Sequence, residues 1–156
     1  MFKTILFCTD FSESAHWAFT YALNLSKIHG SKLLILHVTP EPVHPEQLSI
    51  YLPPEKVEDL RTAQKQGLER ELKTHYLQRM DLEGFHEYQV LIKEGEAFYE
   101  IIQAARQGAA DLIVLGTHGR TGLDHVFFGS TAERVVRQAP CPVMTVRLPG
   151  KRFTMA

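Results

Sequence analysis

The chain has 156 residues, of which 44% are hydrophobic and 22% charged, as in ordinary globular proteins long enough to bury one substantial core. Its formal net charge of -1 excludes a strong overall attraction to nucleic acid or to an anionic membrane. We therefore expect a single domain over residues 1–156, with neither nucleic acid nor a membrane among its partners.

The chain lacks the patterns of a membrane span, a secretory signal and a metal-binding cysteine cluster. No apolar stretch approaches the roughly 18 residues that a spanning helix needs, and Asp10 interrupts the apolar start. We therefore expect a cytoplasmic protein. Cys8 and Cys141 lie in apolar runs without metal-ligand spacing, so we interpret both as small buried side chains and predict no metal site.

The first part of the chain predicts a strand, a helix and a second strand. Residues 3–10 are a compact apolar run ending in a polar turn, which is typical of a strand buried on both faces. A helix follows, capped at its start by Ser12 or Ser14 and at its end by Gly30. Its apolar positions at helical spacing are Ala15, Ala18, Phe19, Ala22 and Leu25. Residues 32–38 predict the second buried strand.

The pattern changes at residues 39–54, which hold five of the eight prolines. This segment cannot be a continuous helix or a central strand, and a loop of this length is either disordered or a functional lid. Residues 55–80 predict a long charged helix that ends at Gly84. Its apolar stripe consists of Val57, Leu60, Leu68 and Leu72.

The remaining elements again alternate between strands and helices. Strands are predicted at 86–95, at 111–116, which is fully apolar and therefore central, and at 142–146, where Pro142 suits a sheet edge. Helices are predicted around Phe98 to Ala105, closed by Gly108, and over 130–139. Strands that alternate with helices indicate an α/β fold with a parallel sheet covered on both faces.

In such sheets the ligand binds beyond the carboxyl ends of the strands, where the strand order reverses. Thr9 and Asp10, Val38, and the glycine-rich stretch of residues 116–132 all fall on this edge and should converge on one crevice. The stretch does not have the spacing of a dinucleotide-binding or Walker A motif. Its glycines are Gly116, Gly119, Gly122 and Gly129, and Ser130 follows at a helix start. Glycine allows close approach, and a helix N-terminus attracts anions, so the stretch indicates a phosphate cradle.

Each of these polar residues also has a purely structural interpretation. Ser130 and Glu133 have the spacing of a capping box, and Asp10 has the position of a helix cap. His118 and Arg120 can contact phosphate oxygens or project into solvent.

The same loop contains a weak metal pattern. Asp124 and His125 together with His118 provide three ligand types, but a divalent ion bridging bound phosphates is more plausible than a site made by the protein alone.

The spacing of Gly116, Gly119, Gly129 and Ser130, namely Gly, two residues, Gly, nine residues, Gly and then Ser, resembles the nucleotide-binding branch of the universal stress protein family. The sequence CTDFS at residues 8–12 is similar to the end of the first strand in that family. The resemblance covers essentially the whole chain in the right order.

This resemblance implies a Rossmann-like three-layer sandwich with five parallel strands, similar to the adenine nucleotide alpha hydrolases. It places Asp10 on the adenine side, the Val38 backbone against adenine and Gly116 near the ribose. The implied phosphate ligands are Gly119, Gly129, Ser130 and Thr131. Two positions depart from the usual family pattern: Thr131 often has a valine counterpart, and Cys8 stands where proline is common.

Three functions are compatible with these features. The resemblance favours an ATP-binding regulatory stress protein with Mg²⁺ on the phosphates and at most slow hydrolysis, because no lysine in the loop and no clear base are evident. The alternatives are a phosphotransferase or hydrolase and an interaction module that needs no nucleotide. The apolar edge strand at the C-terminal end predicts a homodimer.

Overall fold

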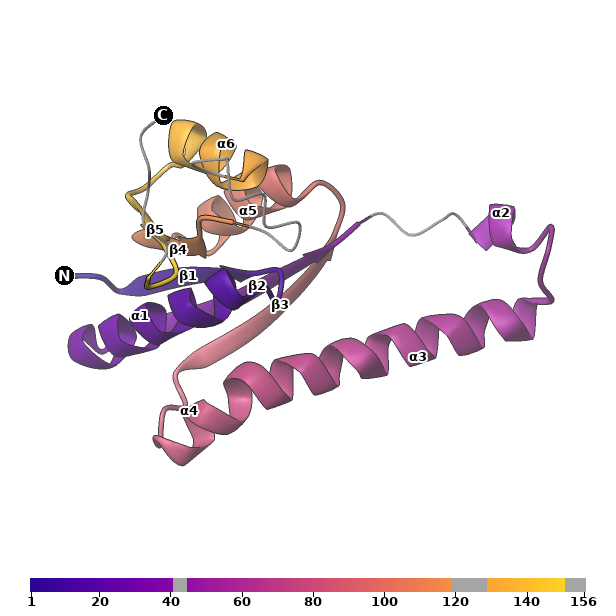
Figure 1. Cartoon of the computed structure of the whole chain (residues 1–156), viewed down its shortest axis with the longest axis horizontal. Helices are drawn as coiled ribbons and strands as arrows, with labels where there is room; N and C mark the ends of the chain where they lie inside the picture. Colours follow the sequence, from indigo (N-terminus) through magenta and orange to yellow (C-terminus); the bar gives the residue numbers. More distant parts are fainter. Residues whose placement is uncertain (41–44, 119–128, 151–156) are drawn as a thin grey trace. The chain divides into compact units, whose positions relative to one another are not determined.

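The computed structural model describes residues 1–40, 45–118 and 129–150. Five strands form one parallel sheet in the order β3-β2-β1-β4-β5 (Figure 1), which confirms the predicted α/β architecture. The strands are β1 (Thr4–Thr9), β2 (Lys32–Thr39), β3 (Tyr88–Glu94), β4 (Leu112–Gly116) and β5 (Val143–Val146).

The apolar runs of the sequence occupy the interior of this sheet. In the middle strand, Phe7 is fully buried and lies in register with Ile35 of β2 and Val114 of β4. β4 is an interior strand next to β1, in agreement with its apolar sequence. β5, which begins directly after Pro142, forms one edge of the sheet as predicted.

Helices cover both faces of the sheet, so residues 1–39 and 87–150 form a three-layer sandwich (Figure 1). α1 (Glu13–His29) packs on one face, where Phe19 contacts Phe7 with ring centroids 5.4 Å apart. α5 (Ala97–Gln107) and α6 (Ser130–Gln138) pack on the other face against alternate strand residues. Because side chains alternate across a strand, Cys8 faces α5 and α6 while Phe7 faces α1.

Local signals fix the ends of α1. Ser12, not Ser14, is the N-cap, since its side chain accepts a hydrogen bond from the Ala15 amide at 3.2 Å. Gly30 ends the helix at φ 64°, a left-handed conformation that glycine adopts without steric cost. One core position was wrong: Leu25 is only half-buried, and its neighbour Leu23 is fully buried instead.

The contacts group the chain into two compact units, Met1–Thr39 with Glu87–Ala156, and Pro40–His86. The single domain over residues 1–156 therefore stays a prediction. Within the second unit lie the short helix α2 (Pro45–Leu48), α3 (Pro54–Leu72), the π-helical segment η1 (Lys73–Leu77) and α4 (Gln78–Leu82).

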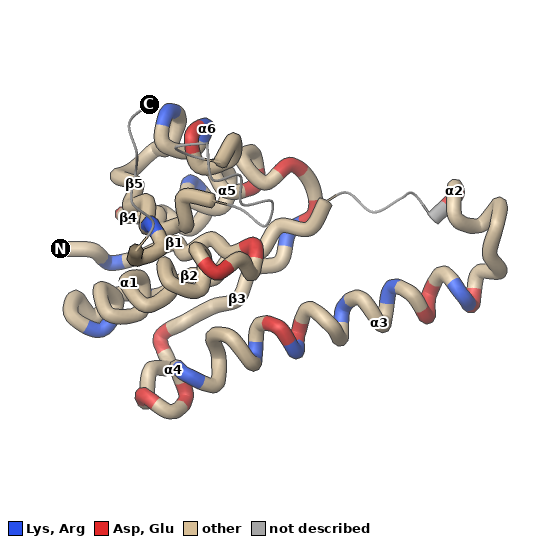
Figure 2. Tube along the Cα trace, in the orientation of Figure 1, with Lys and Arg blue, Asp and Glu red and all other residues tan. Residues whose placement is uncertain are grey.

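The helix predicted over 55–80 is therefore not one regular α-helix, because the π-helical segment η1 lies between α3 and α4. Acidic and basic residues are both distributed along α3 (Figure 2). Val57 and Leu72 are buried as predicted, whereas Leu60 is 53% exposed, so the predicted stripe was wrong at that position. Gly84, at φ 67°, marks the exit from the helical region. None of the described helices is both long enough and apolar enough to span a membrane.

Candidate functional site

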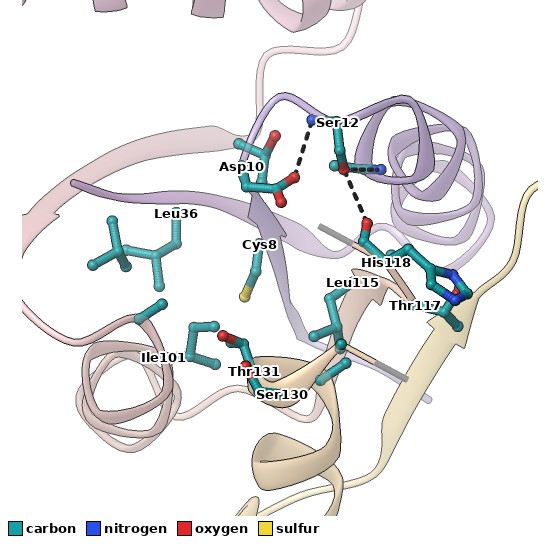
Figure 3. Close-up of a pocket in the computed structure, with 17 residues that line it drawn as sticks. Cys8, Asp10, Ser12, Leu36, Ile101, Leu115, Thr117, His118, Ser130 and Thr131 are labelled. Atoms are coloured by element: carbon teal, nitrogen blue, oxygen red, sulfur yellow. Dashed lines mark hydrogen bonds between the residues drawn. The ribbon is translucent and has the colours of Figure 1, made fainter. Parts of the chain in front are cut away.

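The strand order reverses at β1, whose neighbours are β2 on one side and β4 on the other. At the carboxyl ends of these strands, on the face that carries α5 and α6, lies a cavity of about 260 Å³ (Figure 3). It opens where the topology rule for parallel sheets places a ligand.

Most of the residues selected from the sequence line this cavity. They are Thr9, Asp10, Val38, Gly116, His118, Gly129, Ser130 and Thr131. Gly119, Arg120, Gly122, Asp124 and His125 lie outside the described residues. The three segments that were expected to converge therefore do converge, as far as the structure describes them.

Asp10 lies in a tight turn at the cavity wall (Figure 3). Its Oδ1 accepts a hydrogen bond from the Ser12 amide at 3.0 Å, and the Thr9 hydroxyl oxygen accepts one from the Phe11 amide at 3.0 Å. The interpretation of Asp10 as the cap of α1 is wrong, because Ser12 has that role. One carboxylate oxygen of Asp10 supports the turn, and a carboxylate carries a second oxygen that can accept further hydrogen bonds.

Gly116 ends β4 against the first turn of α1. A Cβ at this position would lie 2.3 Å from Ser14 Oγ and 2.8 Å from the Ser14 carbonyl carbon. Close packing of the protein backbone, independent of any ligand, therefore requires glycine here. Ser14 packs against Gly116 next to the cavity, and the sequence indicated Ser14 only as an alternative cap of α1.

His118 follows at the end of the same segment and lines the cavity. Its Nδ1 lies 2.9 Å from Thr117 Oγ1, and its backbone carbonyl accepts a hydrogen bond from Ser12 Oγ at 3.3 Å. The amide of Gly129 in turn donates to the carbonyl of Thr117 at 2.7 Å. These contacts hold residues 117–118 close to Gly129 and to the start of α1.

The N-terminus of α6 faces the cavity without a side-chain cap. Gly129 is the N-cap residue at φ -61°, and Ser130 is the first helical residue. The predicted capping box of Ser130 and Glu133 is therefore wrong, and Glu133 pairs with Arg137 at 2.9 Å instead. The first amides of a helix have no partners within the helix, so this terminus offers hydrogen-bond donors and a partial positive charge to a ligand.

A second helix N-terminus reaches the cavity from α5, which sequence reasoning missed. Ala97, the first residue of α5, lines the cavity, and its N-cap Glu96 makes no side-chain cap. The Glu96 carboxylate instead pairs with Arg134 of α6, whose guanidinium lies 4.0 Å from the centre of the Phe98 ring. This bridge ties α5 to α6 beside the cavity.

Apolar side chains form the floor of the cavity: Cys8, Leu36, Ile101 and Leu115. Burial raises the pKa of the Cys8 thiol far above its ordinary value, so Cys8 contributes a neutral, apolar surface. Leu36 and Ile101 were not selected from the sequence, because membership of this floor depends on contacts between distant strands and helices.

The cavity thus combines an apolar floor, a carboxylate at one wall and an uncapped helix N-terminus at another. An apolar floor accepts a flat aromatic ring, and a helix N-terminus accepts an anion. Within residues 1–40, 45–118 and 129–150, no three His, Cys, Asp or Glu side chains gather as potential metal ligands.

Comparisons with known proteins agree with this architecture. The profile of the universal stress protein family matches residues 1–147. A universal stress protein of Thermus aquaticus is 40% identical over 147 residues, which cover 94% of this chain and 100% of that protein.

Two solved structures extend the comparison. A hypothetical protein of Methanocaldococcus jannaschii, also called a universal stress protein, has a TM-score of 0.74 at 27% identity, with 96% of this chain and 99% of that one covered. An Arabidopsis thaliana protein of the universal stress protein family with AMP bound has a TM-score of 0.65 at 23% identity, with 95% and 93% covered. At that identity the likeness concerns the fold alone.

Proposed function

Since the chain belongs to the universal stress protein family, we propose that its cavity binds an adenine nucleotide, with ATP as the expected ligand. We propose that the protein acts as a nucleotide-dependent regulator in a stress response. The observation that carries this proposal is the uncapped N-terminus of α6 beside an apolar floor. A nucleotide combines a flat ring with an anionic tail, and the cavity offers a matching surface to each part.

In this arrangement the adenine lies over the apolar floor between Asp10 and the backbone of Val38, and the ribose lies near Gly116. The phosphates lie at the amides of Ser130 and Thr131, next to Gly129, whose own amide donates to the Thr117 carbonyl. Mg²⁺ would be held chiefly by the phosphate oxygens, since magnesium usually keeps few protein ligands in nucleotide sites.

The remaining phosphate contacts belong to the segment outside the described residues. We assign them to Gly119, Arg120 and Gly122, with His118 at its border. Arginine suits this role because its guanidinium stays charged and can bind two phosphate oxygens at once.

We propose binding with at most slow hydrolysis. Among the described residues that line the cavity, Asp10 is the one acidic side chain. It lies at the wall assigned to adenine, and one of its carboxylate oxygens accepts a hydrogen bond from the Ser12 amide. Phosphoryl transfer needs a residue that orients the nucleophile near the phosphates. A bound nucleotide then acts by favouring one conformation of the protein.

We further propose a cytoplasmic homodimer joined through β5, the short apolar strand at the sheet edge. An edge strand presents backbone groups that a second copy can pair with. Sedimentation at micromolar concentration tests this, and a monomer there contradicts it.

The nucleotide proposal is tested by denaturing freshly purified protein and identifying the released compounds by chromatography and mass. The control is Gly129→Val, because valine tolerates φ -61° and adds bulk at the cavity wall. Adenine nucleotide released from the parent but not from the control supports the proposal. None from either, with no shift in melting temperature at millimolar ATP, contradicts it and favours a nucleotide-independent interaction module.

A further inference from the structure

Behind the wall of the cavity, Phe11 adopts a backbone conformation that is unfavourable for its side chain. Its φ is 61°, and among the described residues only Ala109 shares a positive φ without being glycine. A bulky aromatic residue rarely occupies this left-handed region, and such strain persists only where the surroundings enforce it. Phe11 follows Asp10 directly, so the strain lies in the turn that forms the cavity wall.

Two hydrogen bonds within the turn hold this conformation. The Phe11 amide donates to Thr9 Oγ1 and the Ser12 amide donates to Asp10 Oδ1, each at 3.0 Å. Both are local side-chain turns of the kind that threonine and aspartate form with a backbone amide two residues later. They fix one carboxylate oxygen of Asp10 to the backbone.

His37, on the neighbouring strand β2, contacts the turn through its ring and through a hydrogen bond. The ring centroids of Phe11 and His37 lie 4.7 Å apart at an interplanar angle of 40°. His37 Nδ1 lies 2.8 Å from the carbonyl oxygen of Thr9, and because a carbonyl only accepts, Nδ1 carries the proton. Thr9 and His37 are also partners in the register of β1 and β2.

Neither Phe11 nor His37 lines the cavity, whereas the residues that follow or precede them do. Val38 comes directly after His37, and successive side chains of a strand point to opposite faces of the sheet. His37 therefore supports from behind the two places that the proposed function assigns to adenine, Asp10 and Val38.

We infer that Phe11 and His37 are positioning residues that hold Asp10 and Val38 for the nucleoside part of the ligand, and this inference rests on the proposed function. Without the pair, the turn relaxes from its unfavourable conformation and the binding geometry of Asp10 is populated only part of the time. The apparent affinity for the nucleotide then falls in proportion to the fraction of molecules in the binding geometry.

The test compares Phe11→Ala, His37→Ala and the double variant for binding of ATP and of inorganic tripolyphosphate. We expect each single variant to weaken ATP binding by about tenfold, through loss of the binding-competent population. The double variant should lose little more, because the two residues act as one unit. Tripolyphosphate binding should stay unchanged, since none of the proposed phosphate contacts is made by Phe11, His37, Asp10 or Val38. Phe11→Tyr keeps the ring and should keep the affinity.

A matched control comes from a second pair of the same kind. Phe2 and His29 make an edge contact with centroids 5.2 Å apart, and neither residue lines the cavity. Phe2→Ala should lower the melting temperature without changing ATP affinity. If Phe11→Ala does only the same, the pair is merely structural and the inference is overturned.

An experiment without nucleotide separates this inference from the proposed function. Hydrogen exchange of the Ser12 amide reports the Asp10 turn directly, because that amide is bonded to Asp10 Oδ1. Faster exchange at Ser12 in both single variants, relative to Phe2→Ala, supports the positioning role. Unchanged exchange overturns it even if the parent binds ATP, whereas a parent that binds no nucleotide overturns the proposed function and with it the ligand assigned to the pair.

Discussion

Gly116 and Ser14 approach so closely that no side chain fits between them. A Cβ on Gly116 would lie 2.3 Å from Ser14 Oγ and 2.9 Å from the Ala15 amide nitrogen. Ser14 is buried, with 2% of its surface exposed, and its hydroxyl donates to the carbonyl of Val146 at 3.4 Å. The end of β4, the start of α1 and the end of β5 therefore meet at one crowded point beneath the cavity.

Gly116→Ala should destabilise the protein. Part of the clash is with backbone atoms, so the element ends must move, and overpacking of this kind costs about 1–3 kcal/mol. Urea denaturation of parent and variant measures the difference. Gly67→Ala is the matched control, because that glycine lies in α3 with nothing near its missing Cβ, and alanine there should stabilise by up to about 1 kcal/mol. Unfolding midpoints of Gly116→Ala equal to those of the parent would contradict the packing argument.

The buried hydroxyl of Ser26 has no hydrogen-bond partner in the part of the chain that the structure describes. An unsatisfied buried hydroxyl is unfavourable, and alanine is the better helix former. Ser26→Ala should therefore stabilise α1 and raise the unfolding free energy by about 0.5–2 kcal/mol. Ser14→Ala, at a serine that is hydrogen-bonded, should lower it. Thermal melts of both variants check the opposite signs, and a loss of stability in Ser26→Ala would contradict the first.

Asp111 makes part of the stability depend on pH. Its Oδ2 accepts hydrogen bonds from the amides of Thr4 at 2.9 Å and Lys3 at 2.7 Å, and these bonds lower the pKa of the carboxyl below its ordinary value of 3.8. A lowered folded-state pKa stabilises the protein above pH 3.8, and the contribution is lost as the pH falls from there through the folded-state pKa.

Asp111→Asn should therefore melt at a lower temperature than the parent near pH 6. The difference between the two melting temperatures should shrink below pH 3.8, because the parent carboxyl then becomes neutral as well. Melting curves at successive pH values measure this. A difference that stays constant down to the acid limit would show that the carboxylate charge is irrelevant.

The sequence predicted the sheet and the place of the cavity because both depend on local signals. Apolar runs such as that of β1 mark buried strands, and the crevice follows from the topology of a parallel sheet. The helix α6 starts at Ser130 as predicted, but its N-cap is Gly129 and not Ser130, because both residues suit an N-cap and no local rule separates them.

Other features depend on contacts between distant segments and leave no local pattern. Ser14 is near Gly116 only in the folded chain, and Ala97 reaches the cavity only because α5 packs beside α6. The left-handed Phe11 is the clearest case, since aromatic residues disfavour that conformation and part of what holds it is a contact with His37 on the neighbouring strand.

The two cysteines differ in burial and can report on it. Burial raises the pKa of both thiols, most strongly for Cys8 in the cavity floor, while Cys141 is only partly buried. Because the thiolate is the reactive form, iodoacetamide at pH 8 should label Cys141 at least about ten times faster than Cys8 in the folded protein. In urea the two rates should become similar. Mass spectrometry of the peptides measures both, with Cys141→Ser as the control that isolates Cys8. Rapid labelling of Cys8 in the folded state would mean that the cavity floor is open to water and would weaken the case for an apolar ring bound there.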